Sequence, residues 1–150
     1  MKMNIFKILF FFHIILLGMC FEAGAQNIEL TVIGNSETVP EKMDMNQLRS
    51  VLRGEKMRWD DGTTIKIALM KTNTSTGSLT SEKIYNMSAN ELNKYFLALV
   101  FQGKVKAPLF FTSERELENY VAITPGAIGV SDNSVAGNIQ VIEVDGKIQI

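Results

Sequence analysis

Eight polar residues, Lys71 to Ser78 (KTNTSTGS), form the stretch of this chain that is best suited to binding chemistry. An alternating apolar segment typical of a strand precedes them, and a helical pattern follows. In open α/β sheets, ligands bind beyond the carboxyl ends of strands, where a helix N-terminus offers free N–H groups to an anion. Hydroxyl side chains can add donors, and glycine permits close backbone approach. The stretch therefore predicts an anion site at Lys71, Ser75, Thr76, Gly77 and Ser78.

The same stretch has a second interpretation as an ordinary solvated connection with a helix cap. Clusters of Ser, Thr and Gly between regular elements are most often connections of this kind. The residue types alone favour the connection over the binding site, and both interpretations stay open at this point.

Catalytic residues are scarce in this chain. The only His, His13, and the only Cys, Cys20, lie near the N-terminus in a segment that we expect to be removed. The rest therefore lacks the usual zinc ligands, a thiol nucleophile and a His-dependent triad. A Ser–Lys pair would need Lys71 to be buried before it could act as a base, but its neighbours are polar. Asp60 and Asp61 are adjacent and point to opposite sides of an extended stretch. We predict no enzymatic activity, metal or cofactor.

The first 25 residues have the pattern of a secretory signal peptide. Lys2 and Lys7 supply positive charge, residues 5–17 are apolar, and Ala23-Gly24-Ala25 matches an A-x-A cleavage site. The apolar run is too short for a membrane span. Cleavage there is favoured over lipid modification at Cys20, because the bulky Met19 precedes that cysteine. The pattern predicts an exported, periplasmic protein with one domain over residues 26–150.

The charge of the chain argues against nucleic acid as a partner. Its formal net charge is −1, and it contains no block of basic residues. Since no disulfide is available after removal of the signal peptide, the domain must depend on its hydrophobic core.

Two helices are predicted from sharp local signals. Asp44 and Gln47 match a capping box before an apolar stripe, and Gly54 occupies the position where a left-handed residue ends a helix. Ser88 and Glu91 match a second capping box, before the longest helix, which ends at Gly103. Its predicted buried face consists of Leu92, Tyr95, Phe96, Leu99 and Val100.

The remaining pattern alternates strands with helices. Strands are predicted at residues 28–33, 63–70 and 127–130, and a right-handed β-α-β crossover is expected to join the first two. A helix is predicted to start at Ser78 or Thr80, and another is predicted after a Ser113 cap. Asp145-Gly146 predicts a C-terminal hairpin that extends the sheet antiparallel at one edge. The predicted class is α/β, with a mixed sheet flanked by helices.

The order of these parts resembles a known family. Leu48, Val51, Leu52, Gly54, Trp59 and Gly62 follow the order of a helix, a glycine, a Trp and a turn into a strand. Residues 99–103 with Pro108, and residues 124–129, extend the same pattern. Together these segments resemble the second lobe of periplasmic phosphate-binding proteins, which are type 2 solute-binding proteins of ABC transporters. The resemblance covers residues 29–130.

The resemblance implies a fold and a function. The implied fold is a single-lobe, type 2 periplasmic-binding-protein-like domain. The implied function is capture of phosphate or a similar small oxyanion, with Lys71 where the family has an arginine and Thr76-Gly77-Ser78 near a Ser-Gly-Thr turn. The mature chain is long enough for one lobe only. We therefore expect a second option, a non-catalytic periplasmic adaptor whose partner is an envelope protein or transporter component.

Overall fold

The computed structural model describes residues 28–103, 106–132 and 139–150. The predicted signal peptide, with His13 and Cys20, lies outside the described residues. Its cleavage and the proposed export therefore stay predictions.

A five-stranded mixed sheet forms the centre of the protein, in the order β4-β3-β5-β1-β6. The strands are β1 (Thr31–Asn35), β3 (Lys66–Met70), β4 (Leu109–Phe111), β5 (Ala127–Ser131) and β6 (Ile139–Val141). Strands β3, β4 and β5 are parallel to one another, whereas β1 runs antiparallel to both β5 and β6. A second, two-stranded sheet pairs β2 (Lys42–Met43) with β7 (Glu143–Val144) in parallel.

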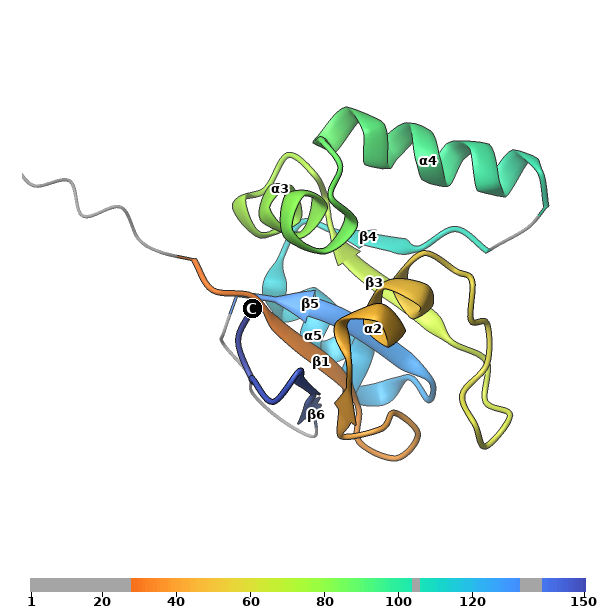
Figure 1. Cartoon of the computed structure of the whole chain (residues 1–150), viewed down its shortest axis with the longest axis vertical. Coiled ribbons are helices and arrows are strands. Elements are labelled where there is room, and N and C mark those ends of the chain that lie inside the picture. The colour runs from red at the N-terminus through yellow and green to blue at the C-terminus, as the bar shows by residue number, and fades with distance from the viewer. Residues whose placement is uncertain (1–27, 104–105, 133–138) are drawn as a thin grey trace, which may run out of the picture.

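Helices cover both faces of the large sheet. They are α2 (Met45–Leu52), α3 (Ser75–Thr80), the π-helix η1 (Ser81–Tyr85), α4 (Ala89–Phe101) and α5 (Glu114–Ile123). Side chains of α2, η1 and α4 form the larger core cluster with Val32, Leu69 and Ile128. Helix α5 contributes Leu117 and Val121 to a smaller cluster on the other face. Figure 1 shows α2 in front of the sheet, α5 behind it and α4 along the top of the molecule.

Both predicted capping boxes are present. The Asp44 side chain accepts the Gln47 N–H at 2.8 Å, and the Gln47 side chain accepts the Asp44 N–H at 2.9 Å. Ser88 and Glu91 form the same reciprocal pair at the start of α4. Gly54 has a φ of 76°, so the predicted left-handed stop after α2 is confirmed.

The predicted crossover between the first two long strands is wrong. Strand β5 lies between β1 and β3, and β1 runs antiparallel to β5 while β3 runs parallel to it. The right-handed crossover rule applies only to parallel strands of one sheet, so it has no bearing on this pair. The connection between neighbouring parallel strands is instead the one from β3 to β4, which contains α3, η1 and α4.

Three further predictions need correction. Helix α3 starts at Ser75 rather than at Ser78 or Thr80, because the Thr74 side chain accepts the Gly77 N–H and caps the helix earlier. Ser113 is the N-cap residue of α5, but its side chain makes no capping hydrogen bond. Val100 was predicted to be buried, yet it is 41% exposed, because only Leu92 and Phe96 of α4 are buried against the core.

The C-terminal hairpin is shorter than its turn signal predicted. Asp145 and Gly146 both have positive φ, and Val144 and Lys147 exchange two backbone hydrogen bonds across them. Beyond that bridge the chain leaves the hairpin, and Ile150 instead bonds to the Leu30 backbone. The predicted antiparallel addition at the sheet edge is made by β6, which pairs with β1, whereas β7, directly before the turn, pairs parallel with β2 in the small sheet.

Candidate functional site at the carboxyl edge of the sheet

The three parallel strands end at one edge of the sheet, and a polar residue comes directly after each of them. Lys71 follows β3, Thr112 follows β4, and Asp132 follows β5. The Lys71 N–H donates to the Phe111 carbonyl at 2.9 Å, which ties the first two exits together. This edge, called the carboxyl edge below, is where ligands bind in open α/β sheets.

Helix α3 begins directly at this edge. The Thr74 hydroxyl donates to the Lys71 carbonyl at 2.8 Å and accepts the Gly77 N–H at 3.1 Å. The Thr74 carbonyl accepts the Ser78 N–H at 2.9 Å. The N–H groups of Ser75 and Thr76, in the first turn, have no acceptor within the helix itself and are the donors available to a ligand.

The five predicted site residues are adjacent in space but differ in exposure. Lys71 and Ser75 are exposed and Ser78 is half-buried, so their side chains are accessible to a ligand. Thr76 is buried, and its hydroxyl bonds to the Glu114 carboxyl group. Gly77 is also buried, and a Cβ added to it would lie 2.1 Å from the Lys71 carbonyl oxygen. Gly77 thus allows α3 to pack against its own preceding loop.

Two glutamates of α5 complete the edge. The Ser131 hydroxyl oxygen lies 3.0 Å from Glu114 Oε2 and 3.1 Å from Glu118 Oε1. One hydroxyl proton can be donated to only one of these carboxyl groups, so simultaneous bonding to both requires a proton on one of them. Burial raises the pKa of Glu114, and the negative charges of Asp132 and Glu118 raise it further, against hydrogen bonds from Thr76 and Ser131 that lower it. The pKa of Glu114 is therefore raised above its ordinary value, with burial as the largest cause.

The charge at the carboxyl edge is mixed. Lys71 is the cation of the predicted site, and Glu114, Glu118 and Asp132 are the acidic groups beside it. An anionic ligand is attracted by the first turn of α3 and by Lys71, and it is repelled by ionised carboxylates. Protonation of Glu114 removes one negative charge and adds a hydrogen-bond donor.

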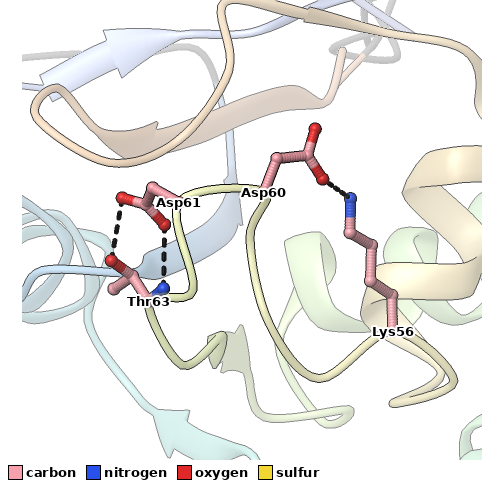
Figure 2. Close-up of polar contacts among 4 residues, drawn as sticks. All are labelled: Lys56, Asp60, Asp61 and Thr63. Atoms are coloured by element: carbon pink, nitrogen blue, oxygen red, sulfur yellow. Dashed lines mark hydrogen bonds and ion pairs between the residues drawn. The ribbon is translucent and has the colours of Figure 1, made fainter.

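The two adjacent aspartates that precede β3 do not form a metal site. Figure 2 shows Asp60 and Asp61 pointing to different partners. Asp60 pairs with Lys56 at 2.8 Å, and Asp61 accepts the Thr63 N–H and hydroxyl at 2.8 and 2.9 Å. Within the described residues, no cluster of three or more His, Cys, Asp or Glu side chains is arranged to hold a metal ion.

Trp59 has the core-sealing role that is usual for a Trp in such a turn. Its side chain is buried, and Nε1 donates to the Gly126 carbonyl at 3.1 Å. The Lys56 ammonium lies 5.9 Å from the centre of its ring, within the range of a cation–π contact. Trp59 therefore closes the far end of the sheet and is remote from the carboxyl edge.

Five residues of the carboxyl edge were not predicted from the sequence: Thr112, Glu114, Glu118, Ser131 and Asp132. A signal was available for Ser131 and Asp132, because they end a run of small and apolar residues that was assigned to a strand. The two glutamates follow Ser113 in an ordinary helix pattern, Glu114 in the first turn and Glu118 beyond it, and glutamates on a helix are usually solvated. Only the packing of α5 against β5 turns them toward Ser131.

Comparisons with known proteins find the same fold in solved structures. No family model matches the sequence, and no curated protein matches it. Solved structures match with TM-scores of 0.60 to 0.62 over about 80% of this chain, at 13 to 18% identity. Three of them are an ABC-type phosphate transport receptor from Vibrio cholerae, PstS from Borrelia burgdorferi and a Clostridium perfringens protein with bound phosphate. The last is described as a phosphate ABC transporter substrate-binding protein.

The chain has the fold of one part of these proteins. It spans 45 to 48% of the length of each of the three. The predicted resemblance to phosphate-binding proteins of ABC transporters and the predicted α/β class are therefore confirmed at the level of the fold. Among the helices that the structure describes, none combines the length and apolar character needed to cross a bilayer.

Proposed function

We propose that this chain is an exported, non-catalytic solute-binding protein that holds phosphate or a similar small oxyanion at the carboxyl edge. The observation that carries the proposal is the start of α3 directly beyond β3, with Lys71, Ser75 and Ser78 accessible beside its first-turn N–H groups. This combination supplies charge, hydroxyl donors and backbone donors to one anion. The solved structures with the same fold include one with bound phosphate.

Glu114 makes the proposed binding dependent on pH. Its carboxylate opposes an anion at the carboxyl edge, and its pKa is raised above the ordinary value, mainly by burial. As the pH falls, protonation replaces a repelling charge with a donor. Oxyanion affinity should therefore increase as the pH is lowered toward 5, and Glu114→Gln should bind more tightly than the wild type at pH 7.

Isothermal titration with phosphate and with sulfate tests this function. We expect binding heat and a rise in Tm at millimolar ligand, since a ligand that binds only the folded state stabilises it. Lys71→Gln should weaken binding roughly fivefold, the size expected for one exposed charge. Lys147→Gln, which removes an exposed lysine of the C-terminal turn that is not among the predicted site residues, is the matched control. If neither anion produced binding heat or a rise in Tm between pH 5 and 7, the proposed function would be ruled out.

The exposure of Lys71 at the same edge supports the proposal that the chain is not catalytic. Lys71 is exposed, which keeps its ammonium group solvated and unsuited to act as a base for Ser75 or Ser78. A reproducible hydrolysis of phosphoesters or esters that Lys71→Ala abolishes would contradict this part of the proposal.

A second candidate function is a non-catalytic interaction module that contacts an envelope protein or transporter component. It is favoured by the α4 patch, defined as Leu97, Val100 and Phe101, which are 58%, 41% and 83% exposed. Exposed apolar patches commonly mark protein contacts. A pull-down from envelope extract tests it. The wild type should reproducibly recover one protein, and the Phe101→Ser variant should not. If the variant recovered the same protein, the α4 patch would not be the contact surface.

A further inference from the structure

A groove of about 460 Å³ lies at the amino ends of β3 and β4, at the opposite edge of the sheet from the proposed oxyanion site. It is called the amino-edge groove below. Its walls come from the loop after α2, the start of β3, the segment before β4, and α5. Strand β4 pairs with β3 only from Ala68 onward, so the beginning of β3 is not covered by a strand on that side.

Apolar side chains form a large part of the groove lining. Ile65, Ile67 and Tyr120 are half-buried, while Met57 and Leu109 remain 59% and 48% exposed. Large apolar side chains that line a concave surface and stay accessible are typical of sites that bind a partner.

The groove also carries positive charge, and none of the described residues that line it has a carboxylate. Lys56, Arg58, Lys66 and Lys106 all line it. The Lys56 charge is offset by its pair with Asp60, which is 2.8 Å away and highly exposed. Arg58 is held in place by hydrogen bonds to the Gly62 carbonyl at 2.8 Å and to the Thr64 hydroxyl at 3.4 Å. Neither of the two ion pairs found among the described residues involves Arg58 or Lys66.

These charges and the adjacent strand limit what can occupy the groove. A second copy that presented its own groove would bring Arg58, Lys66 and Lys106 against the same cations, which like-charge repulsion disfavours. Addition of a strand to β4 is also disfavoured, because β4 has only three residues and follows Pro108, which has no backbone N–H to donate. The occupant must therefore offer apolar side chains together with negative charge.

We propose that the amino-edge groove binds a peptide segment of a partner protein that carries apolar side chains flanked by Asp or Glu. The apolar side chains contact Met57, Ile67 and Leu109, and the carboxylates pair with Arg58 and Lys66. The inference deepens the interaction-module function and rests on it, and it is independent of oxyanion binding. It adds a second surface to the α4 patch and specifies the chemistry of the partner.

Selection from a random peptide library displayed on phage tests this proposal with the complete mature chain. Selected peptides should be enriched in both acidic and large apolar residues. A synthetic peptide of the consensus sequence should then bind roughly tenfold more weakly to Lys66→Glu, and more weakly to Met57→Ser. Lys147→Glu is the matched control, since it makes the same charge reversal on an exposed residue outside the groove. Each variant is checked for an unchanged Tm.

Three outcomes would contradict the proposed binding of an acidic, apolar peptide in the amino-edge groove. No enriched peptide, or enriched peptides without acidic residues, would rule out the proposed occupant. Binding that is lost with Phe101→Ser but kept with Lys66→Glu would place the contact on the α4 patch, leaving the interaction-module function intact. Equal loss with Lys66→Glu and Lys147→Glu would show attraction to net charge rather than to the groove.

Discussion

The two edges of the parallel strands β3, β4 and β5 have opposite character. At the carboxyl edge, hydroxyl and carboxyl groups are bonded to one another, and Ser131 contacts both Glu114 and Glu118. At the amino edge, apolar side chains remain exposed, and Arg58 and Lys66 take part in no ion pair found among the described residues. The strands are the same, so the difference comes from the segments attached to their two ends. The N-termini of α3, which the Thr74 hydroxyl caps, and of α5 lie at the carboxyl edge, and irregular loops lie at the amino edge.

The largest expected effect concerns the packing of α3 at the carboxyl edge. Gly77→Ala should lower the free energy of unfolding by about 2 to 3 kcal/mol, because the new Cβ would meet the Lys71 carbonyl oxygen at 2.1 Å. Gly62→Ala, near the amino edge, is the matched control. Its φ is +86° but no atom lies within 4 Å of the added Cβ, so a loss of about 1 kcal/mol is expected. Equal urea midpoints for the two variants would show that α3 is not tightly packed there.

The next effect separates two serines in equivalent N-cap positions. Ser88→Ala should cost about 1 kcal/mol, since its hydroxyl accepts the Glu91 N–H at the start of α4. Ser113→Ala should change stability by less than about 0.5 kcal/mol, because Ser113 makes no side-chain cap bond. Urea unfolding of both variants measures the difference. A similar cost for both would mean that the Ser113 side chain caps α5 in solution.

A smaller effect is expected from the raised pKa of Glu114. Because the folded state holds this proton more tightly than the unfolded state does, stability should fall as the pH rises above the ordinary value of 4.5. After allowance for solvent screening, Glu114→Gln should be a few tenths of a kcal/mol more stable than the wild type at pH 7. The advantage should vanish near pH 4, where both side chains are neutral.

The control for the Glu114 prediction is Glu37→Gln, which changes an exposed carboxylate of the β1–β2 connection. This variant measures what the loss of one exposed negative charge does to stability at each pH. If Glu114→Gln lost stability at pH 7, the carboxylate would be stabilised at the carboxyl edge, and the proposed proton on this group would be wrong.

The smallest expected effect lies at the amino edge. Met57→Ser should change the free energy of unfolding by less than about 0.5 kcal/mol, because the side chain is already 59% exposed. The same variant should weaken binding of the selected acidic peptide. A Tm drop of several degrees would instead show that Met57 supports the fold, and that its exposure does not mark a binding surface.

Part of this structure could be predicted from neighbouring residues. The capping boxes at Asp44 and Ser88 and the left-handed stop at Gly54 each depend on residues within one or two turns, so local hydrogen bonding decides them. The position of Lys71 beyond the end of a strand was also predicted, because an alternating apolar segment ends just before it. The alternation of strands with helices was enough to predict the α/β class.

The arrangement of strands could not be predicted in the same way. Strand β1 pairs with β5, about one hundred residues along the chain, with Thr31 opposite Ser131. Short apolar strands can pair in several orders and directions, and the burial of both sheet faces selects among them. Local pattern therefore favoured a crossover that the complete core does not contain.

The sequence by itself determined the capped starts of α2 and α4, the stop of α2 at Gly54, the α/β class, and the polar segment at the start of α3. Only the tertiary structure decided that Thr76 faces Glu114, that Glu118 is buried beside Ser131, and that the amino-edge groove stays open. The physical reason is the range of the interactions. Caps and turns depend on groups a few residues apart in the sequence, whereas burial, pKa shifts and grooves depend on which distant segments pack together.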